Sequence, residues 1–448
     1  MKAGRHNTKR DVEYGRQVAT IPVINSSPAE GASFPNYYLG GSGPSRETGA
    51  PLIVLWKVGG TGATCHCLTC VQIPIMDILD LFNGKLLELP RSRSEEDYEK
   101  FFKDWFDEFL ASIDPLTSGD WVSRELKKHK AAVSSLCEGI LEALRSYFDG
   151  HPSNAYERFR QAMEVIRPWL SPLAFPGDVA SHLQFLYRAR VGSLTDFTRK
   201  DLFHIPFEMR TLVEPQRYSI SGLPSLYLGG SVWVCWEELG RPSFETMQIS
   251  RFKAVEGSGI HLLDLGFRPA MIAAFMVKHP QIISIKCPNS EFILAHAICW
   301  PLFAACSVLV KHPKRPFIPE YVIPQLLLQW IQSELSFDGI RYFSTRIAQY
   351  VEDPDLAANY VFPVKVSKPT GFCDQLTTKL HLSRPISWQI LQSFSFSFKE
   401  SIVNGPIVNR TKWPLKINAD LKVLYGQTKF WNCEAKINSL PCDYVLNV

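Results

Sequence analysis

The sequence carries no strong excess of charge of either sign. Its 448 residues include 48 Lys and Arg against 44 Asp and Glu, a net charge of +4, and the two signs are interspersed. A nucleic-acid-binding domain usually gathers Lys and Arg on one face or stretch, so we expect no nucleic-acid partner. Hydrophobic residues make up 46% of the chain, which is enough for a large buried core.

Long apolar stretches are also scarce. The N-terminus leads into no apolar segment, so no secretory signal is expected. Only residues 292–310 are nearly all apolar, and this run contains His296 and Pro301. A membrane span needs roughly 20 apolar residues, and no second candidate exists, so the run is predicted to be a buried helix or helix–turn. The chain is therefore expected to be cytoplasmic, with no membrane partner.

The eleven cysteines are odd in number and scattered, which is not the pattern of a disulfide framework. Three of them crowd together at Cys65, Cys67 and Cys70, with His66 between the first two. Zinc takes four sulfur or nitrogen ligands in a tetrahedron, which makes Cys65, Cys67 and Cys70 candidate ligands of a structural zinc ion. The chain shows no clear second ligand pair, and the alternative is three free cysteines.

The spacing of apolar residues changes along the chain and divides it into four parts. They are an irregular lead-in with a strand and the cysteine cluster (1–93), a helical segment (94–172), a mixed domain (173–360) and a β-rich C-terminal extension (361–448). Apolar side chains recur every three or four residues in the second part, as in amphipathic helices. Phe394 to Phe398 alternate with serines in the fourth, as in a strand. The pattern therefore predicts an α+β fold.

Individual elements of the mixed domain are also predicted. They are strands at 183–191, 226–228, 282–286 and 339–342, and helices at 231–239 and 320–334.

Three short segments of the mixed domain follow one another in order. The first is Tyr187-Arg188-Ala189-Arg190, the second is Tyr227-Leu228-Gly229 with Trp236-Glu237-Glu238-Leu239 behind it, and the third is Asp338-Gly339-Ile340-Arg341-Tyr342-Phe343-Ser344. An arginine, a glutamate and a serine placed in this way resemble the RES family, which is named for those residues. The resemblance covers about residues 183 to 350, and Phe343 stands where the family usually has proline.

The resemblance implies an ADP-ribosyltransferase-like RES domain whose characterised relatives are toxins that destroy NAD. It implies Arg188, Glu237 and Ser344 as the catalytic residues. Arg190, two residues further along the strand, and Glu238, next to Glu237, are the alternatives for the arginine and the glutamate. The residues implied as further contacts for NAD are Arg190, Arg217, Tyr227, Glu238 and Tyr342.

These residue types suit cleavage of the N-glycosidic bond of NAD. A guanidinium group can hold the diphosphate through paired hydrogen bonds. A carboxylate stabilises positive charge at the anomeric carbon, as in glycosidases, and a serine hydroxyl can position ribose or phosphate without adding charge. We therefore expect NAD as the substrate.

The expected activity is that of an NAD glycohydrolase or NAD phosphorylase, in a toxin–antitoxin or phage-defence setting. Two alternatives stay open. One is transfer of ADP-ribose to a macromolecule, and the other is a RES fold that binds a nucleotide or a partner without turnover. A toxin needs a restraint, so a neutralising protein partner is expected. The sequence does not set the oligomeric state or the acceptor.

Overall fold

The computed structural model describes residues 76–93, 97–175, 183–192, 197–347, 351, 353–393, 410–416 and 421–446. The chain divides into two compact units, Met1–Cys70 and Val71–Val448, and every described residue belongs to the second. The predicted strand of the lead-in, the cluster of Cys65, Cys67 and Cys70, and the strand at Phe394 to Phe398 all lie outside the described residues.

The predicted helical segment is confirmed. It forms α2 (Tyr98–Ile113), α3 (Trp121–Lys128), α4 (Lys130–Phe148) and α5 (Pro152–Leu170), and α1 (Ile78–Asn83) precedes them. Helix α2 begins after Asp97, whose side chain accepts the Lys100 N–H, as expected of an N-cap. Its aromatic stripe is buried, with the ring of Phe109 4.3 Å from that of Trp300.

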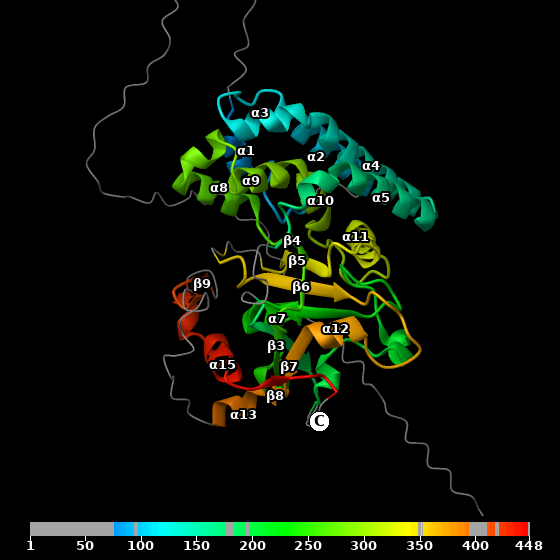
Figure 1. Cartoon of the computed structure of the whole chain (residues 1–448), viewed down its shortest axis with the longest axis vertical. Coiled ribbons are helices and arrows are strands. Elements are labelled where there is room, and N and C mark those ends of the chain that lie inside the picture. Colours follow the sequence, from blue (N-terminus) through cyan, green and yellow to red (C-terminus); the bar gives the residue numbers. More distant parts are fainter. Residues whose placement is uncertain are drawn as a thin grey trace, which may run out of the picture. The chain divides into compact units, whose positions relative to one another are not determined.

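Trp300 belongs to a second set of helices, which completes the same layer from a later part of the chain. The set comprises α8 (Pro269–Lys278), α9 (Pro288–Ile298), α10 (Trp300–Cys306) and α11 (Val322–Ser333). The two sets share one hydrophobic core with strands of the sheet below them (Figure 1). The apolar run at 292–310 is thus the buried pair α9 and α10, as predicted. In the described part of the chain, no helix is long and apolar enough to cross a membrane.

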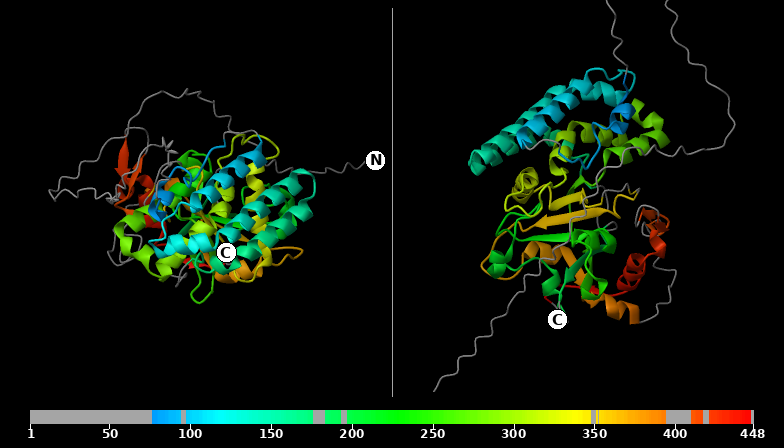
Figure 2. Two further views of the ribbon diagram at one scale, coloured as in Figure 1. Left: turned by 90° about the horizontal axis from the view of Figure 1, so that it is seen from above. Right: turned by 180° about the vertical axis from the view of Figure 1, so that it is seen from behind.

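The sheet contains nine strands and lies beneath this helical layer (Figure 2). Its strands are β1 (Leu186–Val191), β2 (Ser225–Gly229), β3 (Met247–Ala254), β4 (Leu262–Leu265), β5 (Gly339–Phe343), β6 (Ala358–Pro363), β7 (Leu380–Ser383), β8 (Ile386–Ser387) and β11 (Cys442–Asp443). The order is β11-β7-β3-β1-β2-β6-β5-β4, with β8 beside β3, and only β4 and β5 are parallel among the described strands. A second core cluster fills the opposite face.

Strands β1 and β2 separate soon after they meet. Strand β1 pairs with β3 at six positions, but with β2 only at Tyr187 opposite Gly229. Strand β2 pairs with β6 along its whole length. The chain turns from β2 into α7 (Val232–Glu238), where the Ser231 side chain accepts the Val234 N–H. Helix α7 therefore starts beside the point where the two halves of the sheet part.

The C-terminal region combines strands with helices. It contributes β7, β8 and β11 to the main sheet and forms the hairpin β9 (Pro414–Lys416) and β10 (Lys422–Leu424). It also contains α12 (Asp374–Lys379), α13 (Trp388–Ser393) and α15 (Lys429–Ile437). The last two pack with α7 in a third core cluster. The prediction of a β-rich extension did not include these helices, because it rested on the alternation at Phe394 to Phe398, which lie outside the described residues.

Short 3-10 helices complete the described elements. They are η1 (Lys200–Leu202), η2 (Phe207–Leu212), η3 (Phe244–Thr246), η4 (Pro280–Ser284), η5 (Pro319–Tyr321) and η7 (Tyr425–Gln427). The strand predicted at 282–286 is wrong, because η4 occupies most of it. Pro280 lies in the first turn of η4, where its fixed φ suits a helix, and Ile282 and Ile283 pack against the helical layer instead of pairing with a strand.

Candidate functional site

Glu238 lies at the end of α7 and meets two strands of the sheet. Its Oε1 atom accepts hydrogen bonds from Ser344 Oγ at 2.6 Å and from Asn359 Nδ2 at 2.7 Å. Its Oε2 atom lies 3.1 Å from Arg346 Nε, and the Glu238 side chain is 35% exposed. The carboxylate is therefore fixed from inside the protein and still open to solvent, which is the arrangement a substrate-facing acid needs.

Ser344 is held firmly at the end of β5. The side chain is buried, and its backbone N–H donates to Ala357 O at 2.8 Å. Arg268 donates to the carbonyl of Ser344 at 3.3 Å, and its guanidinium carbon lies 4.9 Å from the centre of the Phe343 ring. Phe343 thus packs beneath Arg268, and Ser344 keeps a defined position.

Two tyrosines of the predicted set lie near Glu238. Burial raises the pKa of Tyr342 well above its usual value, and the negative charge of Glu238 raises it further. Burial also raises the pKa of Tyr227, with a smaller contribution from Glu238. Tyr342 packs against Tyr218 with ring centres 4.4 Å apart. Both phenols therefore stay protonated at neutral pH and offer ring surface and hydroxyl groups beside the carboxylate.

Arg188 projects from β1 at the place where β1 and β2 part. Its Nη1 atom is buried and has no hydrogen-bond partner among the described residues. Burial, and to a smaller extent the charge of Arg190, lower the pKa of Arg188 to about 10, and Cys235 and Tyr227 oppose this shift. The group is still a cation at pH 7. An unpaired buried donor is costly, so this cation is suited to an anion that the chain itself does not supply.

Arg188 and Glu238 do not touch, but they share neighbours. Arg188 interacts electrostatically with Cys235 and Tyr227. The charge of Glu238 raises the pKa of the same two groups. The alternation of side chains along β1 places Arg188 on the face of Leu186, while Tyr187 faces α7. Arg188 therefore lies on the face of β1 opposite α7, and its link to Glu238 runs through their shared neighbours Cys235 and Tyr227.

The other two arginines of the predicted set are engaged within the protein. Arg190 donates to Asp201 O at 2.9 Å and lies 4.9 Å from the Phe197 ring centre. Arg217 donates to Cys306 O at 3.0 Å and to Val308 O at 2.9 Å. Its guanidinium also lies over the Tyr321 ring, at 5.5 Å. Each of these two guanidinium groups has an acceptor, whereas Arg188 Nη1 has none among the residues that the structure describes.

The neighbouring glutamate, Glu237, has a different environment. It is buried, accepts from Trp233 Nε1 at 3.0 Å, and pairs with Arg241 Nε at 2.8 Å. Successive helical residues point about 100° apart, so α7 directs Glu237 toward its own helix and its C-terminal turn. The structure brings Glu238 to Ser344 and does not bring Glu237 there.

Two residues of this arrangement were missed in the sequence. Asn359 lies on β6 opposite Tyr342, and Arg346 follows the Ser344 turn. A polar residue inside the otherwise apolar strand Ala358–Pro363 was the available signal for Asn359. No group of three or more metal-binding side chains occurs within the described ranges, and Cys65, Cys67 and Cys70 fall outside them.

Comparison with known proteins gives one clear relative. The chain is 32% identical over 324 residues to a Bacillus subtilis (strain 168) protein named "Putative toxin YopC", and the match covers 71% of this chain and 72% of that protein. No family model matches the sequence. No solved structure matches it either.

Proposed function

The chain belongs to the family of the Bacillus subtilis protein "Putative toxin YopC", and we propose that it is a toxin that consumes NAD by cleaving its nicotinamide–ribose bond. The observation that carries the proposal is the carboxylate of Glu238, held by Ser344 and Asn359 and open on its other side. The buried Nη1 atom of Arg188, which has no hydrogen-bond partner among the described residues, supports it. The choice of NAD as the substrate rests on the resemblance of the order of these residues to the RES family.

The proposed roles follow from the charges and donors. Arg188 binds the diphosphate, because its buried Nη1 atom has no acceptor within the described part of the chain and a guanidinium can bind phosphate through paired hydrogen bonds. Glu238, in place of Glu237, stabilises the cationic ribose that forms as the C–N bond breaks and its electron pair leaves with nicotinamide. Ser344 orients Glu238 by donating to Oε1, and Asn359 shares that role. Tyr227 and Tyr342 line the site.

Water, phosphate or a side chain of another molecule can then attack the anomeric carbon. With water, the products are ADP-ribose, nicotinamide and a proton; with phosphate, the phosphate oxygen forms the new bond to carbon. All three reactions use the same residues of this chain, so the acceptor is read from the products.

The test is release of nicotinamide from NAD by the purified full chain, with and without phosphate. We expect Glu238→Gln to lower turnover by about 100-fold or more, the usual loss when one electrostatic stabiliser of a transition state is removed. Glu237→Gln is the matched control, because it makes the same change one residue earlier, and we expect less than a tenfold loss from it. A phosphate requirement would identify phosphorolysis.

Two results would contradict the proposal. Equal losses in the two variants, or a larger loss in Glu237→Gln, would reject Glu238 as the acting carboxylate. NAD binding by calorimetry without release of nicotinamide, in both buffers, would favour a fold that binds nucleotide without turnover.

A further inference from the structure

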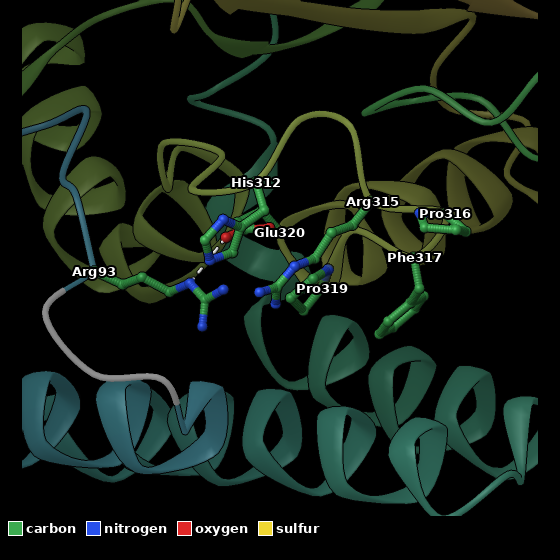
Figure 3. A pocket seen from close by; sticks show the side chains of 7 residues that line it. All are labelled: Arg93, His312, Arg315, Pro316, Phe317, Pro319 and Glu320. Carbon is green, nitrogen blue, oxygen red and sulfur yellow. Dashed lines mark hydrogen bonds and ion pairs between the residues drawn. The ribbon is translucent and has the colours of Figure 1, made fainter. Parts of the chain in front are cut away.

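A separate pocket of about 440 Å³ lies between the helical layer and the loop that precedes α11 (Figure 3). Its lining residues are Arg93, His312, Arg315, Pro316, Phe317, Pro319 and Glu320. This volume is within the range of small-molecule sites, roughly 300–1,000 Å³. None of the residues proposed above to act on NAD lines it.

The pocket has more positive than negative groups. Arg93 Nε donates to Glu320 Oε1 at 2.9 Å, and the two side chains are 4% and 1% exposed. This pair neutralises the one carboxylate of the lining. Arg315 is exposed, forms no ion pair with a carboxylate of the described residues, and points into the same space as Arg93 (Figure 3). The remaining charge favours an anion.

His312 adds an unsatisfied group to this lining. Its Nε2 atom is buried and has no hydrogen-bond partner among the described residues. Buried polar groups in proteins are nearly always hydrogen-bonded, and a lone one indicates a partner from outside the chain. Together, Arg315 and His312 provide nitrogen groups from a single loop, close enough in sequence to bind one phosphate.

The opposite side of the pocket is apolar and partly aromatic. Phe317 is 50% exposed, although a phenylalanine at the surface gains from burial. Its ring stacks on Tyr147 of α4, with centres 6.1 Å apart and planes at 11°, and meets Phe148 edge-on at 6.2 Å. Pro316 and Pro319 flank it. Because Phe317 lines the same pocket as Arg315 and His312, a planar ring and a phosphate can be bound together.

We propose that this pocket binds a nucleoside phosphate, with the phosphate on Arg315 and His312 and the base against Phe317. The pocket is distinct from the NAD site but adjoins it in the chain: Glu320 contributes to the pocket, and the next residue, Tyr321, lies under Arg217. The binding is independent of NAD cleavage.

The test is calorimetry with ADP, which has no nicotinamide to release, on the full chain carrying Arg188→Ala to remove the NAD site. In this background we expect Arg315→Ala to weaken ADP binding at least about tenfold, the loss expected for one charge-assisted hydrogen bond. Lys314→Ala is the matched control: it removes the same charge from an exposed neighbour that does not line the pocket. We expect less than a twofold change from it.

The base is tested with Phe317→Ala and with inorganic phosphate. We expect Phe317→Ala to weaken ADP binding severalfold and to leave phosphate binding unchanged.

Absence of ADP binding in the Arg188→Ala background would overturn the proposal, as would equal losses in Arg315→Ala and Lys314→Ala. Inorganic phosphate bound as tightly as ADP would overturn the assignment to a nucleoside phosphate. His312→Ala leaves the Arg93–Glu320 pair intact. Like Arg315→Ala, it should weaken ADP binding.

Discussion

Two groups of charged side chains, one around Arg341 of β5 and one comprising Glu238 and Arg188, differ in whether their polar atoms find partners within the described chain. In the first, Arg341 donates to Asp264 Oδ1 and to Asp355 Oδ1, both at 2.7 Å, and its side chain is 1% exposed. Burial alone would lower the pKa of Arg341, but the two aspartates outweigh it and raise the pKa well above the usual value. In the second, Glu238 is 35% exposed and Arg188 Nη1 has no partner in the described chain.

The difference separates a cluster that stabilises the fold from one that is ready for a ligand. The chain provides Arg341 with two carboxylate acceptors, Asp264 and Asp355, and leaves space for it, since a Cβ on Gly266 would lie 2.1 Å from Arg341 Nη1. Buried charges persist in a core only when they are paired in this way. The second cluster leaves Arg188 Nη1 without a partner among the described residues, and this costs stability unless a ligand supplies the acceptor.

The largest effect on stability is expected from Arg341→Met. This change leaves Asp264 and Asp355 without their shared cation, and breaking a buried pair in this way costs about 3–5 kcal/mol. Urea unfolding followed by circular dichroism would measure the loss. Asp355→Asn, which keeps the cation and one acceptor, is the milder variant if Arg341→Met does not accumulate. A loss below about 1 kcal/mol in both would contradict the structural role.

The next effect concerns Glu434, which links the C-terminal region to α7. This buried residue of α15 accepts from the Val232 N–H at 2.7 Å and from the Tyr425 hydroxyl at 2.5 Å. Burial raises the pKa of Glu434 from 4.5 to about 7, although Arg410 opposes the rise. The native state therefore holds this proton to a higher pH than the unfolded chain does. Its contribution to stability is complete below about pH 4.5 and is lost as the pH rises through 7.

Glu434→Gln should remove that dependence, because glutamine resembles the protonated acid. We expect nearly equal unfolding free energies for the two proteins near pH 4, below the pKa of the unfolded carboxyl group. At pH 8 the variant should be more stable, by on the order of 3 kcal/mol at most. His204 and His296, whose pKa burial lowers to about 4, change stability in the other direction and equally in both proteins. A constant difference between pH 4 and pH 8 would contradict the assignment.

Compared with Arg341→Met, the variant Arg188→Met should change stability less and in the opposite direction. It removes a partly buried cation whose Nη1 atom has no acceptor in the described ranges, so we expect thermal stability to stay the same or to rise by up to about 1 kcal/mol. NAD binding by calorimetry should be lost. The pair Arg188→Met and Arg341→Met makes the same substitution in both clusters, so comparable destabilisation by the two would remove the distinction drawn between them.

The sequence predicted the elements better than it predicted the site. The aromatic period of α2, the strand that ends at Phe343 and the helix that ends at Glu238 follow from local spacing, and each is present. The choice between Glu237 and Glu238 depends on the rotation of α7, which is fixed by packing on β1 and α15. The Asn359 contact with Glu238 joins residues 121 positions apart. Neither is encoded in a local pattern.

The smallest effect on stability is expected from Arg346→Gln. The ion pair of Arg346 with Glu238 is 3.1 Å long, and its side chains are 56% and 35% exposed, so its removal should change stability by less than about 1 kcal/mol. In the proposed enzyme, Arg346 pairs with Oε2 of Glu238, the oxygen that faces solvent, and competes with the substrate for it. Its removal should therefore change KM more than kcat, in nicotinamide-release kinetics. The Lys103–Asp107 pair on α2, with a distance of 2.6 Å and both side chains exposed, is the control: Lys103→Gln should change neither constant. A loss of kcat as large as that of Glu238→Gln would instead place Arg346 among the groups that act on the reacting bond. The second cluster would then include Arg346 as a member that takes part in the reaction.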